Sequence, residues 1–91
     1  AAEALGLGLV TRVVLPDRLA AETDAIVQRL ASGPTQALGR LKKLLRSSLH
    51  HDLDTHLDAE AAGFAACAAT ADFREGVGAF LGKRAAKFTG A

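Results

Sequence analysis

Only two prolines, Pro16 and Pro34, interrupt this 91-residue chain, and alanine and leucine dominate the rest of it. Twenty residues are alanine and fourteen are leucine, both strong helix formers, whereas aromatic residues make up only 4%. Proline breaks a helix interior because it lacks a backbone N–H and clashes with the preceding turn. The sequence therefore predicts a mainly α fold, with about four amphipathic helices and one short extended segment near the N-terminus.

Length, charge and cysteine content limit the class of protein. A chain of 91 residues suits one domain, and its net charge of +1 argues against a nucleic-acid partner. No apolar run approaches the ~20 residues that cross a bilayer, so we expect no membrane partner. The single cysteine, Cys67, excludes an internal disulfide and indicates a reducing compartment, so we expect a cytoplasmic protein.

The first fifteen residues differ from the remainder. Residues 1–5 are typical of the end of a helix, and residues 9–15 hold the only β-branched cluster. This cluster either pairs as a strand with residues outside this chain or serves as an extended connector. We therefore expect residues 1–15 to differ in role from residues 16–91, which are expected to be helical. The start without methionine, as if within a helix, predicts a fragment.

Apolar side chains recur at helical spacing in each expected helix. The third helix carries a continuous stripe in steps of three or four residues, formed by Leu53, Leu57, Ala61, Phe64 and Ala68. Similar stripes follow Pro16 and Pro34. A core of small residues cannot cover all of these stripes, so we expect some of them to face a partner or a missing domain.

Residues that could form a metal or catalytic site are poorly placed for either. His56 follows His50 and His51 by six and five residues, so the imidazoles are expected to diverge, and no metal site is predicted. Cys67 has no nearby base, which predicts a small buried apolar residue. Glu60 lies within an apolar helix without a second acid or base, so we expect it in a buried or interfacial ion pair.

Two basic clusters have two alternative interpretations. One cluster comprises Arg40, Lys42, Lys43 and Arg46, and the other comprises Lys83, Arg84 and Lys87. Such runs are typical of solvated helix faces, and the alternative is contact with a phosphate-bearing ligand. Composition and spacing alone indicate no catalytic residue.

The start and the end of the last helix are also predicted. Asp72, with Glu75 three residues later, predicts a start that resembles a capping box. Gly82 weakens a helix relative to alanine, so we expect the chain to fray from Lys83 onward.

Short motifs follow one another along the chain in a defined order. They are Ala2-Glu3-Ala4, Gly8-Leu9-Val10-Thr11-Arg12-Val13-Val14, Gly33-Pro34-Thr35 with Ala37 and Lys42 or Lys43, Leu57 and Glu60, and then Thr70, Asp72, Glu75-Gly76, Ala79-Phe80-Leu81, Lys83-Arg84 and Phe88. This ordered set covers nearly the whole chain and resembles the C-terminal region of the enoyl-CoA hydratase/isomerase, or crotonase, family. Two departures are Gly82, where the family commonly has glutamate, and Ala85-Ala86, which replaces a common Lys-Pro pair.

The resemblance implies the helical C-terminal part of a crotonase-like fold, in a lyase or isomerase of fatty acid metabolism that acts on acyl-CoA thioesters. In that family, backbone N–H groups form an oxyanion hole and acidic side chains move protons. These groups lie upstream of the matched segment, so the resemblance implies no catalytic residue here, and this chain by itself is expected to be inactive. No separate cofactor is implied, because CoA is part of the substrate.

The resemblance also implies partners and a binding site. The corresponding region of the family helps to build trimers or hexamers and lies beside the CoA site. The resemblance thus implies that residues 1–15 belong to an absent core and that residues 16–91 form a helical C-terminal oligomerisation domain. Carried over to this sequence, Phe64 and Phe80 would contact the adenosine and Lys83 its 3′-phosphate. A flat apolar ring can stack on adenine, and an ammonium group can meet a phosphate. The alternative is a self-contained helical interaction module without enzymatic activity, which the length and the four amphipathic segments also suit.

Overall fold

The computed structural model describes residues 1–91 and contains helices but no strand. The elements in chain order are α1 (Ala2–Gly6), the 3₁₀ turn η1 (Pro16–Arg18), α2 (Leu19–Ala31), α3 (Thr35–Ser47), α4 (Leu53–Ala68) and α5 (Ala71–Leu81). Four long helices and one short N-terminal helix confirm the predicted mainly α fold. No helix is both long and apolar enough to cross a membrane.

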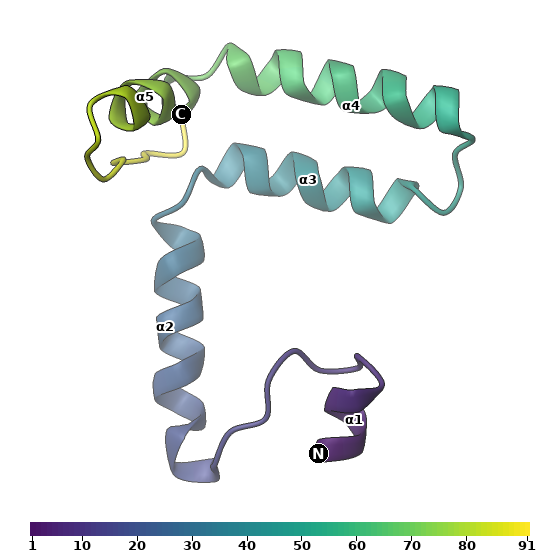
Figure 1. The fold of residues 1–91 in the computed structure, drawn as a ribbon, viewed down its shortest axis with the longest axis vertical. Coiled ribbons are helices and arrows are strands. Elements are labelled where there is room, and N and C mark those ends of the chain that lie inside the picture. The colour runs from purple at the N-terminus through teal and green to yellow at the C-terminus, as the bar shows by residue number, and fades with distance from the viewer.

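Residues 9–15 form the connector between α1 and α2 (Figure 1). The segment ends at Leu15, whose backbone is extended with φ −65° and ψ 149° because Pro16 follows it. Within residues 1–91 this segment pairs with no strand, and its pairing with residues outside this chain stays a prediction. Asp17 lies in the first turn of η1, and Leu15 occupies the N-cap position.

Helices α3 and α4 run antiparallel as a hairpin (Figure 1). They approach closely where Gly63 faces Leu44, since a Cβ atom on Gly63 would lie 3.6 Å from Leu44 Cδ1. Ala59 and Ala66, one turn to either side of Gly63, are also half-buried. The small residues of α4 therefore face α3, whereas Leu57 and Phe64 of the predicted stripe are exposed.

The caps of α4 and α5 differ in part from the prediction. Asp52 caps α4 by accepting a hydrogen bond from the Thr55 N–H at 2.8 Å. Thr70 caps α5, because its hydroxyl accepts the N–H of Phe73 at 3.1 Å. The predicted cap at Asp72 is wrong by two residues, since Asp72 already lies within the first turn of α5.

The molecule is open rather than closely packed. Helix α2 turns away from the α3–α4 hairpin, and α1 lies apart from both (Figure 1). The radius of gyration is 16.8 Å, whereas a compact domain of this length has about 12 Å. The accessible surface is 7317 Å², against about 5,000 Å² for a folded monomer of this mass. Only Asp72 and Ala79 are buried, so residues 1–91 have almost no core of their own.

Candidate functional site

A pocket of about 380 Å³ lies between the start of α3, the end of α4, α5 and the C-terminal residues. Its lining is mostly apolar and comprises Pro34, Gln36, Ala37, Cys67, Thr70, Asp72, Phe73, Gly76, Val77, Phe80, Leu81 and Phe88. Apolar pockets with a few polar groups are where small molecules usually bind. This pocket and the chain around it are the candidate site.

Two of the three predicted CoA-contacting residues lie at or beside this pocket. Phe80 lines it and is 82% exposed. Phe64 is 63% exposed and lies outside the lining, but its ring packs edge-on against Phe73, with centroids 5.9 Å apart. Phe73 does line the pocket, so Phe64 reaches the edge of the pocket through Phe73.

Lys83, the third predicted residue, lies where α5 ends. Gly82 is the C-cap, and Lys83 follows it with φ +48°, the one positive φ at a non-glycine residue. The Lys83 N–H donates to the Phe80 carbonyl at 3.2 Å, and the Arg84 N–H donates to the Ala79 carbonyl at 3.0 Å. These two bonds form a Schellman motif, in which this position is usually glycine. Lys83 is therefore held in a conformation that costs an L-residue about 1–2 kcal/mol.

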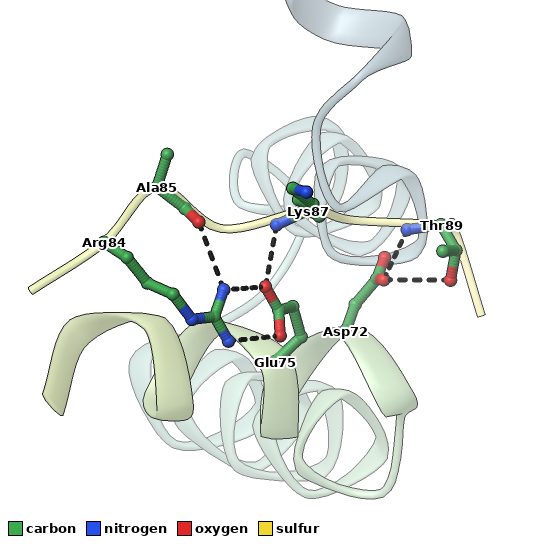
Figure 2. A network of polar contacts seen from close by, with 6 residues as sticks. All are labelled: Asp72, Glu75, Arg84, Ala85, Lys87 and Thr89. Atoms are coloured by element: carbon green, nitrogen blue, oxygen red, sulfur yellow. Dashed lines mark hydrogen bonds and ion pairs between the residues drawn. The ribbon is translucent and has the colours of Figure 1, made fainter. Parts of the chain in front are cut away.

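Residues 84–91, which we call the C-terminal strap, run back along α5 (Figures 1 and 2). The helix ends at Leu81, as the weak Gly82 predicts, but the residues beyond it are not frayed, because α5 carboxylates bind them. The Glu75 carboxylate accepts hydrogen bonds from both terminal nitrogens of Arg84, at 2.6 Å and 2.8 Å. It also accepts a hydrogen bond from the Lys87 N–H at 2.8 Å. The hydrogen bonds from Arg84, followed by that from the Lys87 N–H, lower the pKa of Glu75 to about 2 from its ordinary 4.5.

Asp72 binds the far end of the strap. It is 4% exposed, and its two oxygens accept the N–H of Thr89 at 2.7 Å and the N–H of Gly90 at 2.9 Å. Its own N–H donates to the Ala91 carbonyl at 2.9 Å. The Phe88 ring packs on Gly76, where a Cβ atom would lie 3.5 Å from Phe88 Cε1.

The strap interactions were missed by the sequence analysis, although the sequence carried a signal for them. Asp72, Glu75 and Ala79 are spaced by three and four residues and so share one face of α5. That face carries two carboxylates and then a small residue, a pattern suited to a chain segment that offers N–H groups. Because Asp72 was interpreted as a helix cap, its binding of a returning chain segment was not predicted.

The structure brings two histidines together, contrary to the expected divergence. The rings of His51 and His56 lie 5.9 Å apart. With Asp52 as the N-cap, they occupy the N′ and N4 positions, where a hydrophobic staple forms. The hydrogen bonds from Thr55, and to a smaller degree the nearby His51, lower the pKa of Asp52. No three His, Cys, Asp or Glu side chains lie close enough together to hold a metal ion.

The remaining predicted residues have varied positions. Cys67 is half-buried and lines the pocket, rather than being fully buried. Glu60 is exposed and has no ion-pair partner within residues 1–91, so the buried form of the expected ion pair is wrong. Arg40 is half-buried beside α4, and its Nε atom is buried without a hydrogen-bond partner. This side chain is thus not part of a freely solvated face.

The sequence of this chain was compared with those of known protein families and proteins. The family model for enoyl-CoA hydratase/isomerase matches residues 1–91, the whole chain. The chain is 40% identical over 83 residues to 1,2-epoxyphenylacetyl-CoA isomerase of Escherichia coli (strain K12), covering 91% of this chain and 32% of that protein. It is 39% identical over 86 residues to crotonyl-CoA hydratase of Syntrophomonas wolfei, covering 94% of this chain and 33% of that protein.

A solved structure extends the similarity to three dimensions. An enoyl-CoA hydratase subunit from Geobacillus kaustophilus HTA426 superimposes with a TM-score of 0.93 at 37% sequence identity. The match covers 100% of this chain and 35% of that one. The chain therefore spans about a third of the length of the relatives that it matches.

Proposed function

Because residues 1–91 belong to the enoyl-CoA hydratase/isomerase family, we propose that they form the helical C-terminal region of an enzyme that hydrates or isomerises acyl-CoA thioesters. The match over all 91 residues carries this proposal, together with two relatives named as a CoA-thioester isomerase and a hydratase. The oxyanion hole and the catalytic acids belong to the remainder of such an enzyme. Within this chain we propose no catalytic residue.

The role proposed for this chain is to contact other subunits and the rest of the enzyme. Its accessible surface exceeds that of a folded monomer of equal mass by about 2,300 Å², which is in the range of an obligate interface. Leu49, Leu57 and Phe64 contribute to that surface. A self-contained interaction module would bury these side chains in its own core, so the open structure favours the enzyme region. We propose a trimer or hexamer as the assembly.

The same proposal divides the chain into two parts. Residues 1–15 would pack with the core of the enzyme, since α1 and the connector lie apart from the α3–α4 hairpin (Figure 1). Residues 16–91 would form the oligomerising region. We propose a cytoplasmic location, because the single cysteine indicates a reducing compartment.

For the CoA pocket, we propose that Phe64 and Phe80 contact the adenosine and that Lys83 contacts its 3′-phosphate. The exposure of both rings supports this, because a ring buried in a core offers no face to a ligand. Lys83 follows Gly82, the C-cap of α5, and so lies three residues after Phe80. CoA is the carrier of the substrate, and no further cofactor is proposed.

Two measurements test the proposed function in the natural protein. An antibody to these residues should detect a polypeptide several times heavier than the 9.4 kDa of this chain. The purified protein should consume trans-2-enoyl-CoA substrates, followed by loss of the absorbance of the conjugated thioester. A natural polypeptide of 9.4 kDa, or a longer one without turnover on any acyl-CoA, would contradict the proposal.

A further inference from the structure

The junction between α5 and the C-terminal strap combines an unfavourable backbone conformation with a strong ion pair. Lys83 has φ +48°, and the next residue, Arg84, forms a two-pronged contact with Glu75. A non-glycine residue keeps a positive φ only where its surroundings determine the conformation. The interactions on either side of Lys83 should therefore explain why it does not relax.

On the helix side, the backbone bonds of the Schellman motif are the only restraint. They join Lys83 to Phe80 and Arg84 to Ala79. Similar bonds form at helix ends that have glycine at this position, where no conformational cost arises. They are therefore not specific to a lysine.

On the strap side, Glu75 supplies a restraint that is specific to this chain. Its carboxylate accepts two hydrogen bonds from the Arg84 guanidinium and one from the Lys87 N–H, as Figure 2 shows. Arg84 also donates to the Ala85 carbonyl at 3.1 Å, so its guanidinium links the helix to the strap. Two-pronged contacts between arginine and a carboxylate fix orientation as well as distance. With Arg84 and Lys87 fixed to α5, the backbone of Lys83 cannot relax to a negative φ without moving the strap.

We propose that Glu75 is a positioning residue, which fixes Arg84 and the strap and so holds Lys83 in the conformation that presents its ammonium group to the 3′-phosphate of CoA. This inference rests on the proposed CoA contact of Lys83. Without Glu75, Asp72 would still hold the far end of the strap at Thr89 and Gly90, but Arg84 and Lys87 would be released from α5. The φ of Lys83 could then become negative, and its side chain would leave α5 in a different direction.

The test compares the affinities of the natural protein for CoA and for 3′-dephospho-CoA, measured by calorimetry. Lys83→Gln is expected to reduce the preference for CoA about tenfold, because it removes one charge-assisted contact with the phosphate. Glu75→Gln should reduce the same preference at least about threefold while binding dephospho-CoA normally. Glu60→Gln is the matched control, an exposed glutamate without an ion-pair partner, and should change neither affinity.

The double variant distinguishes positioning from an independent effect. If Glu75 acts through Lys83, Glu75→Gln combined with Lys83→Gln should be no worse than Lys83→Gln alone. Arg84→Lys gives a second variant, since it keeps the positive charge but removes the two-pronged contact, and it should also reduce the preference.

Each contrary outcome identifies what has failed. An unchanged preference in Lys83→Gln would overturn the phosphate contact, and with it the positioning role. A preference that falls in Lys83→Gln but not in Glu75→Gln would overturn the positioning role and leave the CoA contact intact. Equal losses for both ligands in Glu75→Gln would reduce Glu75 to a structural residue and overturn the inference.

Discussion

Asp72 and Glu75 lie one turn apart on α5 and bind the same strap, but their environments differ. Asp72 is buried and accepts two backbone N–H groups, whereas Glu75 is partly exposed and pairs chiefly with a guanidinium. Asp72 thus pairs backbone N–H groups that the strap removes from solvent. Glu75 supplies a negative charge for the Arg84 guanidinium and fixes its orientation. Substitution of the two should therefore have different consequences.

Asp72→Ala should destabilise the natural protein by about 1–3 kcal/mol, because the N–H groups of Thr89 and Gly90 lose their acceptors. Urea denaturation followed by circular dichroism gives the free energy of unfolding. Asp58→Ala, at an exposed position of α4, serves as the control and should stay within about 0.5 kcal/mol of the wild type. Equal losses in the two variants would show that the strap contacts of Asp72 contribute nothing.

Glu75 predicts a particular pH dependence of stability. Its folded-state pKa of about 2 lies below the ordinary 4.5, so the folded protein binds fewer protons than the unfolded chain between these values. The stabilisation by Glu75 is therefore fully present above pH 4.5 and is lost as the pH falls towards about 2. The difference in Tm between wild type and Glu75→Gln should be constant near neutral pH and should close in acid. A difference in Tm that stays constant from neutral pH down to pH 2 would refute the assignment.

At the scale of the elements, the helices were predictable because their signals are local. Alanine and leucine content and the two prolines indicate where α2 and α3 can lie. The side of each helix that packs was harder to predict. In α4 the large apolar stripe is exposed and the small residues face α3, because close approach of two helices requires small side chains.

The strap was not predictable in this way, because it depends on contacts between separate segments. Asp72 fits a capping position by local pattern, and only the return of Thr89 and Gly90 along α5 reveals its partners. Within the candidate site, the residue types came from the resemblance. The positive φ of Lys83 could not be foreseen, since glycine stands one residue earlier, at Gly82.

Lys83→Gly should strengthen the C-terminal end of α5. Glycine adopts a positive φ without the cost that lysine bears, and the gain is offset in part by the greater freedom of the unfolded chain. We expect a net stabilisation of about 0.5–1 kcal/mol, measured as a rise in Tm of the natural protein. Lys87→Gly is the control, because Lys87 has no positive φ, and it should not raise the Tm. A lower Tm in Lys83→Gly would mean that the lysine side chain itself stabilises the fold.

At the scale of the whole molecule, the structure has secondary structure without a core of its own. Its helices are well formed, yet only Asp72 and Ala79 are buried, and the radius of gyration of 16.8 Å exceeds that of a compact domain. Amphipathic helices in proteins owe most of their stability to the packing of their apolar faces. The arrangement of α2 relative to the α3–α4 hairpin should therefore depend on surfaces supplied from outside residues 1–91.

Residues 1–91 produced alone should accordingly associate or lose their fixed arrangement. We expect sedimentation velocity to show species heavier than the 9.4 kDa monomer, and we expect the chain to bind a dye that reports exposed apolar surface. A variant with Leu53, Leu57 and Phe64 each changed to glutamine should associate less, because it removes the exposed stripe of α4. As the control, the same three substitutions in the natural protein should impair its assembly, since the proposed subunit contacts would cover the stripe there. A monodisperse monomer of residues 1–91 that unfolds cooperatively and binds no dye would contradict this prediction, and would favour a self-contained helical module over a region that depends on its partners.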